Sequence, residues 1–285
     1  MNYFKRLLLS FVGLLPYFVM AQIDTSDIVR PVASAWEIGV GHTSIADTYL
    51  SPLQYDGMGI DLRYERRRAM SFNPDKWTMA FDASVGVDRV LNPARNSLMW
   101  SGNLDLSWGM MHRWRLPHSA ILAAGGSTSL DLGCIYSARN GNNPASAKAA
   151  WTINLTGELS WSTLLAKRRL VLSYRPTIPI TGLFFAPNYA EPYYEIYLGN
   201  ADGLCHGAWW GNYFKMQNRV IADWYLSRTT ALRIGYDGTI FSTRVNNVTT
   251  QMISHSVVVG VSGEWLKFAH GGTCNENSRI ISAIY

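Results

Sequence analysis

Hydrophobic and polar residues alternate one by one along most of this chain. Between Leu98 and Met110, large apolar side chains occupy most of the even positions, and Ser101, Asn103 and Asp105 stand between them. Successive side chains of a β-strand point to opposite faces, so this pattern indicates a strand with one apolar and one polar surface. The same division recurs in the segments 77–88, 151–161 and 232–240.

This period of two predicts ten strands, at residues 35–42, 55–69, 77–91, 97–115, 119–137, 148–166, 168–184, 215–228, 230–246 and 250–268. The linkers between them alternate between tight turns and longer loops, as outer-membrane barrels do on their periplasmic and external sides. An even count places both ends of the barrel on the side of the tight turns. The segment 185–214 is long enough to hold another hairpin, which would give twelve strands.

A soluble β-sandwich also alternates, so other features must separate it from a membrane barrel. The polar faces carry charges deep inside long strands, and the chain offers no second apolar sheet or amphipathic helix to cover the apolar face. These features predict an all-β fold, an antiparallel transmembrane β-barrel over residues 22–268. Aromatic residues also gather towards strand ends, as in the belts at the two membrane interfaces: Trp77, Trp100, Trp114, Trp151, Trp161, Tyr174, Trp224 and Trp265.

Residues 1–21 have the pattern of a cleaved signal peptide. Lys5 and Arg6 precede the apolar stretch 7–20, and small residues before Gln22 suit signal peptidase. The stretch is shorter than the roughly 20 residues that span a bilayer, so a retained anchor helix is the less favoured alternative. The later sequence has no comparable apolar segment, and mean hydropathy is −0.02, which argues against a helical membrane protein.

Charge and cysteine content add little chemistry. The net charge is +5, and the one cluster of basic residues, Arg66 to Arg68, is interpreted as a solvated or lipid-headgroup patch rather than a nucleic-acid site. Cys134, Cys205 and Cys274 are odd in number and far apart, unlike a disulfide framework or a zinc site. One bridge between two of them stays an alternative, and we expect no cofactor and no metal.

Five short segments, at residues 48–53, 111–117, 142–147, 193–200 and 209–214, resemble the bacterial family catalogued as domain of unknown function 3316. The resemblance implies an outer-membrane protein of a Gram-negative bacterium and no known activity. As an outer-membrane barrel, the protein is expected to contact outer-membrane lipid and lipopolysaccharide, and the barrel-assembly machinery during its biogenesis. The tail 269–285 extends beyond the resemblance and is expected to be a polar overhang.

The polar faces carry acidic and basic residues that would point into the barrel. Carboxylates that lie close together could act as acid and base or hold a cation. The interpretation we favour is a network of mutually paired charges, because the interior of a narrow barrel is filled by side chains. The candidate network is Asp61, Arg63, Glu65, Asp82, Asp105, Asp131, Glu158, Arg175, Arg219, Asp223, Arg233, Asp237 and Glu264.

The segment 185–214 is unusually aromatic. In an external loop its rings could stack on a glycan or a partner, fold inward as a plug, or extend two strands into the interface belt, and the last two readings together are favoured. The candidate surface comprises Tyr189, Tyr193, Tyr194, Tyr197, Trp209, Trp210 and Tyr213.

Enzyme chemistry finds little local support. Neither His206 nor His255 has a hydroxyl two residues later, because Ala208 and Val257 stand at those positions. Ser256 is adjacent to His255, so on a strand the two side chains point to opposite faces. We therefore expect a narrow channel or a structural or binding component of the envelope. The alternative is a hydrolase that modifies lipid or lipopolysaccharide, which requires a His, a Ser and an acid to meet near the outer rim.

Overall fold

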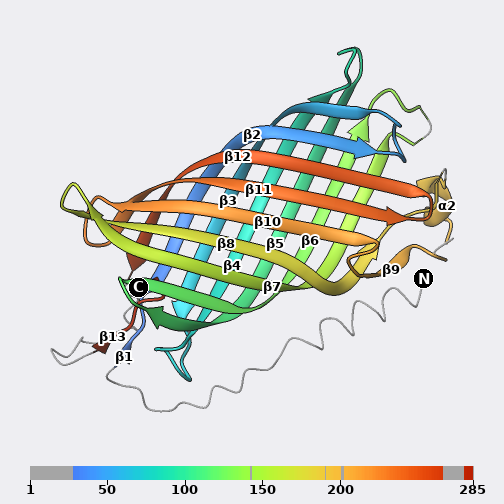
Figure 1. Cartoon of the computed structure of the whole chain (residues 1–285). Helices are drawn as coiled ribbons and strands as arrows, with labels where there is room; N and C mark the ends of the chain where they lie inside the picture. The colour runs from blue at the N-terminus through green and yellow to red at the C-terminus, as the bar shows by residue number, and fades with distance from the viewer. Residues whose placement is uncertain (1–27, 142, 190, 200–201, 266–278, 285) are drawn as a thin grey trace.

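The computed structural model describes residues 28–141, 143–189, 191–199, 202–265 and 279–284. Ten long antiparallel strands form a closed barrel (Figure 1). The sheet closes because β10 pairs with both β8 and β11, and β12 pairs with β2. The barrel strands are β2 (Val32–Asp47), β3 (Gln54–Ala69), β4 (Trp77–Leu91), β5 (Leu98–Leu116), β6 (Ala120–Ser137), β7 (Ala145–Leu165), β8 (Arg168–Phe185), β10 (Tyr213–Tyr225), β11 (Thr230–Val245) and β12 (Val248–Trp265).

The predicted count of ten barrel strands is confirmed. The segment 185–214 holds no additional barrel hairpin. It contains the short helix α2 (Tyr193–Tyr197) and the four-residue strand β9 (Cys205–Ala208), which pairs only with the end of β8. The first barrel strand is longer than the predicted 35–42, because small residues such as Ala33 and Ala46 weaken the alternation at both of its ends.

The two ends of the barrel differ. The end with the connections 70–76, 117–119, 166–167 and 226–229 is called the turn end, and both β2 and β12 meet there through the pair Val32 and Trp265. The opposite end, the loop end, carries the remaining connections. One of them is shorter than predicted, since Asn246 and Asn247 form a two-residue turn with φ of 53° and 59°, the left-handed values that a tight hairpin requires.

Side chains alternate between the two surfaces of the wall. On β2, Trp36, Ile38 and Val40 face outward and are each about half exposed, whereas Glu37 and Thr43 face inward and are buried. Apolar residues therefore cover the outside and polar residues the lumen, as the alternation predicts. In the part of the chain that the structure describes, no helix has the length and apolarity needed to cross a membrane.

One stretch of the wall lacks a complete ladder. β8 and β10 pair only from Thr177 with Gln217 to Leu170 with Trp224. Towards the loop end, β8 shifts its register on β7 after Ile153 and then pairs with β9 instead. We call the unpaired stretch between β8 and β10 the seam. The indole of Trp210 donates a hydrogen bond to the carbonyl of Pro179 there.

The two described ends of the chain meet at the turn end. The short strands β1 (Ile28–Val29) and β13 (Arg279–Ile280) pair in parallel beside the barrel (Figure 1). The expectation of a polar overhang at 269–285 is wrong for the residues after Ile280, because Ile281, Ser282 and Ala283 are buried. The signal peptide, Cys274 and residues 266–278 lie outside the described residues.

Candidate functional site

Buried charges cross the lumen in the half nearer the turn end. Strand register brings them to one level, for example by placing Glu65 opposite both Ala35 and Asp82. We call this set the ion-pair layer. It comprises Glu37, Arg63, Glu65, Arg67, Asp82, Glu158, Arg175, Arg219, Asp223, Arg233 and Asp237.

Glu65 lies at the centre of the layer and is 3% exposed. Its two oxygens accept hydrogen bonds from Arg175 at 2.8 Å, Arg219 at 3.0 Å and Arg233 at 3.3 Å, and it also pairs with Arg67. A buried carboxylate is stable only when charge and hydrogen bonds replace its lost water, and four guanidinium groups supply both here.

Three further acids accept hydrogen bonds from the same arginines. Glu158 accepts from Arg175 at 3.0 Å, and both oxygens of Asp223 accept from Arg233 at 2.7 Å. Glu37, which is 1% exposed, accepts from Arg233 at 2.6 Å. The arginines are thus shared between acids, so the layer is one connected network.

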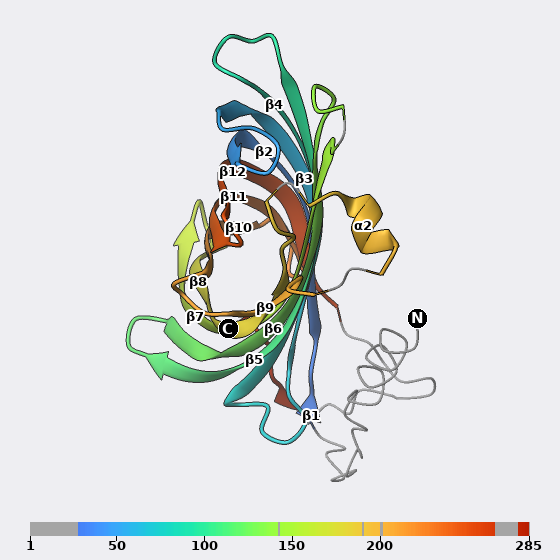
Figure 2. The same cartoon turned by 90° about the vertical axis from the view of Figure 1, so that its right-hand side faces the viewer.

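The layer spans the full width of the barrel. Glu65 belongs to β3 and Arg175 to β8, which are five strands apart in either direction around the ring of ten. Their contact therefore joins diametrically opposite walls. Figure 2 shows the same closed ring in the second view. Because the side chains of the layer are mostly under 10% exposed, they fill the cross-section at this level.

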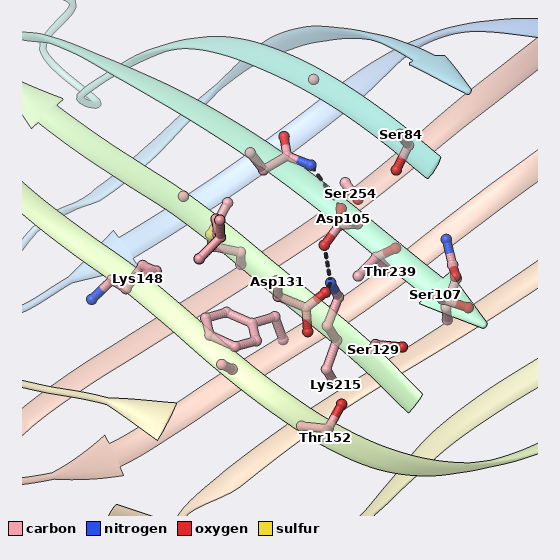
Figure 3. A pocket seen from close by; sticks show the side chains of 18 of the residues that line it. Ser84, Asp105, Ser107, Ser129, Asp131, Lys148, Thr152, Lys215, Thr239 and Ser254 are labelled. Atoms are coloured by element: carbon pink, nitrogen blue, oxygen red, sulfur yellow. Dashed lines mark hydrogen bonds and ion pairs between the residues drawn. The ribbon is translucent and has the colours of Figure 1, made fainter. Parts of the chain in front are cut away.

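A cavity of about 240 Å³ lies on the loop side of the layer. Lys215 reaches across it from β10 and donates to Asp105 at 2.6 Å and Asp131 at 2.8 Å (Figure 3). Asn103 supports Asp105 with a hydrogen bond of 2.9 Å, and the hydroxyl of Tyr213 donates to Asp131 at 3.4 Å. These contacts form a second, smaller set of charges across the lumen, which we call the Lys215 crosspiece. Many of the remaining lining residues carry hydroxyls, among them Ser84, Ser107, Ser129, Thr152, Thr239 and Ser254.

The cavity wall carries more acid than base. Six aspartates and five basic side chains line it. Among the described residues, neither Asp61 nor Asp88 forms an ion pair. The hydroxyl of Thr43 donates to Asp88 at 2.7 Å. Two carboxylates on β3 and β4 therefore face the cavity without a paired cation, although the whole chain is basic.

Part of the long loop covers the loop end, and we call residues 186–189 and 191–193 the cover. The hydroxyl of Tyr49 donates to the carbonyl of Glu191 at 2.6 Å, and the backbone N–H of Ala147 donates to the hydroxyl of Tyr193 at 2.6 Å. The side-chain amide of Asn246 donates to the carbonyls of Ala186 and Gly203 at 3.2 and 3.0 Å. Burial raises the pKa of Tyr193 to about 12.

The aromatic residues expected on this loop divide into three kinds. Tyr193 is half-buried in the cover and packs edge-on against Tyr49. Tyr213 needs correction: it is 2% exposed and lies inside the lumen, because β10 begins at this residue with its side chain inward. The rest are exposed at the loop end: Tyr189, Tyr194, Tyr197, Trp209 and Trp210.

The predicted network residues also divide. The ion-pair layer and the Lys215 crosspiece bring together Arg63, Glu65, Asp82, Asp105, Asp131, Glu158, Arg175, Arg219, Asp223, Arg233 and Asp237. Asp61 faces the cavity instead. Glu264 is buried near the turn end, and one of its carboxylate oxygens lacks a hydrogen-bond partner among the described residues.

Sequence reasoning missed Glu37, Arg67 and Lys215. The run from Arg66 to Arg68 suggests one surface patch, but the period of two separates Arg67 from both neighbours and turns it inward. Glu37 alternates with Trp36 and Ile38, a signal that was present but unused. Lys215 is the first residue of the predicted strand 215–228, so the alternation does not show whether its side chain points inward or outward.

The two tested histidines do not form the arrangement that the hydrolase alternative required. His206 contacts the carbonyl of Ala186 and the amide of Asn246, and His255 contacts the hydroxyl of Tyr236 at 2.5 Å. Within the described ranges, no Ser or acid is a hydrogen-bond partner of either ring. The same residues contain no group of three or more His, Cys, Asp or Glu side chains that could hold a metal ion.

Comparison with known proteins gives a family and a set of barrels. A family described as a protein of unknown function (DUF3316) matches residues 7–271, in agreement with the resemblance seen in the sequence. No curated protein matches the chain.

Similar solved structures have low identity. The outer membrane protease OmpT of Escherichia coli is 7% identical at a TM-score of 0.47, covering 82% of this chain and 97% of its own. The transport unit of the autotransporter AIDA-I from Escherichia coli is 7% identical at 0.45, covering 93% and 97%. The translocator domain of the autotransporter NalP from Neisseria meningitidis is 11% identical at 0.41, covering 92% and 94%.

Proposed function

Because the chain belongs to the DUF3316 family, whose function is unknown, we propose a role from the geometry: an outer-membrane barrel that binds a small cationic solute in its lumen and does not conduct ions. The apolar outer surface and the charged inner surface support a location in lipid, since a transmembrane barrel faces lipid outside and water or polar side chains inside.

The contact between Glu65 and Arg175 carries the non-conducting part of the proposal. It joins opposite walls within a layer of buried charges, so an ion crossing the barrel would have to separate paired groups that have no water to replace them. A conducting barrel keeps an aqueous passage through the lumen instead.

The cavity supports binding as the function. It is enclosed on the turn side by the ion-pair layer, and many of its lining side chains can exchange hydrogen bonds with a hydrophilic solute. Asp61 and Asp88 add negative charge without a paired cation, and the rings of Tyr213 and Phe241 offer π faces. This combination favours a small solute with a protonated amine and disfavours an anion.

Planar-bilayer recording of the purified, refolded protein tests the absence of conduction. We expect the protein to insert without discrete current steps, with an open porin in the same bilayer as the control. Regular steps from the unaltered protein would overturn the non-conducting proposal and favour the narrow channel.

Calorimetric titration with three probes of matched length tests the solute class: 1,4-diaminobutane, 1,4-butanediol and succinate. We expect only the diamine to bind. The variant D61N/D88N should weaken its binding by at least about tenfold, or about 1.4 kcal/mol. D56N is the matched control, since Asp56 lies on the same strand but is exposed on the outside. Binding of succinate alone, or of no probe, would reject a cationic ligand.

A further inference from the structure

The described end of the chain returns to the barrel and enters its turn-side opening. The N–H of Ile281 donates to the carbonyl of Val29 at 2.9 Å, which continues the parallel pairing of β13 with β1. Ile281 and Ser282 are each 4% exposed and Ala283 is 6% exposed. Burial of this degree in three consecutive residues indicates a seated segment.

A buried arginine holds the backbone of this segment. Arg113 faces inward at the turn end of β5 and is 7% exposed. Its guanidinium donates to the carbonyl of Ser282 at 2.8 Å and to the carbonyl of Pro74 at 2.7 Å. Arg113 forms no ion pair with a carboxylate among the described residues, so carbonyl oxygens, including one from the C-terminal segment, replace its lost water.

The last described residue lies under the ion-pair layer. Ile284 packs against the buried cluster of Val171, Tyr225 and Ala231 at the turn end. It also lines a second, small cavity of about 20 Å³ together with Asp223 and Arg233 of the layer. The segment therefore lies between the ion-pair layer and the turn-side opening of the barrel.

We infer that residues 281–284 act as a seal that keeps water from the turn side out of the ion-pair layer. The turn-side opening is thus occupied by a segment of this same chain, whose small and branched apolar side chains fit it. The lumen is then closed at two successive levels, first by this seal and then by the paired charges. This inference does not depend on the proposed ligand.

Thiol labelling tests the seal directly. In a background where Cys134, Cys205 and Cys274 are replaced by serine, S160C places one thiol beside Ile284, because Ser160 is 7% exposed and lines the same small cavity. A charged, membrane-impermeant maleimide then reports access from the turn side. We expect deletion of residues 279–285 to increase the labelling rate at least tenfold.

Two further variants keep the test decisive if the truncated chain folds poorly. I284D in the full-length chain should increase the rate in the same way, because a carboxylate cannot remain in the apolar cluster. R279A is the control: its ion pair with Asp75 at 2.7 Å is largely exposed, so the rate should stay within twofold.

A synthetic peptide of residues 279–285 separates a seal from general loosening of the barrel. Added to the truncated protein, it should restore slow labelling, whereas a scrambled peptide should not. Equal labelling rates for the full-length, truncated and I284D proteins would overturn the inference. Fast labelling that the peptide fails to reverse would also overturn it, since the effect would then lie in the barrel.

Discussion

The carboxylate of Glu65 and the guanidinium of Arg175 meet at 2.8 Å although their strands lie on opposite sides of the barrel. The contact shows how this barrel buries charged side chains in its interior. Neither side chain could be buried alone, and each is satisfied by a partner from a distant part of the chain. Closure of the ring and pairing of the charges therefore depend on each other.

Removal of the central carboxylate should destabilise the barrel strongly. E65Q leaves the guanidinium groups of Arg67, Arg175, Arg219 and Arg233 without their shared anion. The expected loss in the free energy of unfolding is about 3–5 kcal/mol, as for other broken buried pairs. Urea unfolding in lipid vesicles measures it. E195Q is the control, because Glu195 is exposed in α2, and an equal effect of both variants would contradict a central role for Glu65.

Charge on the outer surface should be costly at mid-strand only. Val40 faces outward halfway along β2, and Ser44 faces the same way nearer the loop end. If lipid surrounds the barrel, V40R should cost about 2–4 kcal/mol and S44R about 0–1 kcal/mol in vesicle unfolding experiments. Similar costs at the two positions would argue against a bilayer around this wall.

Ionisation of Tyr193 should release the cover at high pH. Its pKa is raised to about 12 by burial, against about 10 in the unfolded chain. The folded state therefore favours the neutral phenol, and this contribution to stability is complete below pH 10 and is lost as the pH rises through 12. Ultraviolet titration of the protein minus Y193F should show one phenol ionising near pH 12. A difference curve centred near pH 10 would contradict the buried position.

The side chain of Asn246 should hold the cover in place. N246A removes the amide that binds the carbonyls of Ala186 and Gly203. We expect faster proteolytic cleavage within residues 186–212, by about fivefold if one net hydrogen bond of about 1 kcal/mol is lost. N247A also places an alanine at a left-handed backbone position but keeps the side-chain amide of Asn246, so it is the matched control. Equal cleavage of the two variants would assign the effect to the turn itself.

The local pattern predicts the wall of this barrel better than its interior contacts. Alternation at Leu98 to Met110 depends only on neighbouring residues, so it reveals both the strand and its facing. The partner of Glu65 depends on closure and on the stagger between strands, which no local pattern contains. The inward position of Tyr213 is hidden from the local pattern for the same reason, since its facing follows from where β10 begins. The burial of Ile281 likewise depends on the folded barrel, because the turn-side opening forms only when distant strands come together.

The seam between β8 and β10 makes the wall mechanically uneven. Elsewhere neighbouring strands pair along most of their length, and widening the ring would break many backbone hydrogen bonds together. At the seam, the indole of Trp210 donates a hydrogen bond to the carbonyl of Pro179 and the ring of Phe184 packs against Tyr213, but Pro179 has no N–H to donate to a neighbouring strand. Under lateral pressure from the bilayer, deformation would therefore concentrate at this one longitudinal line, beside the end of the lumen where Tyr213 and Lys215 reach into the cavity.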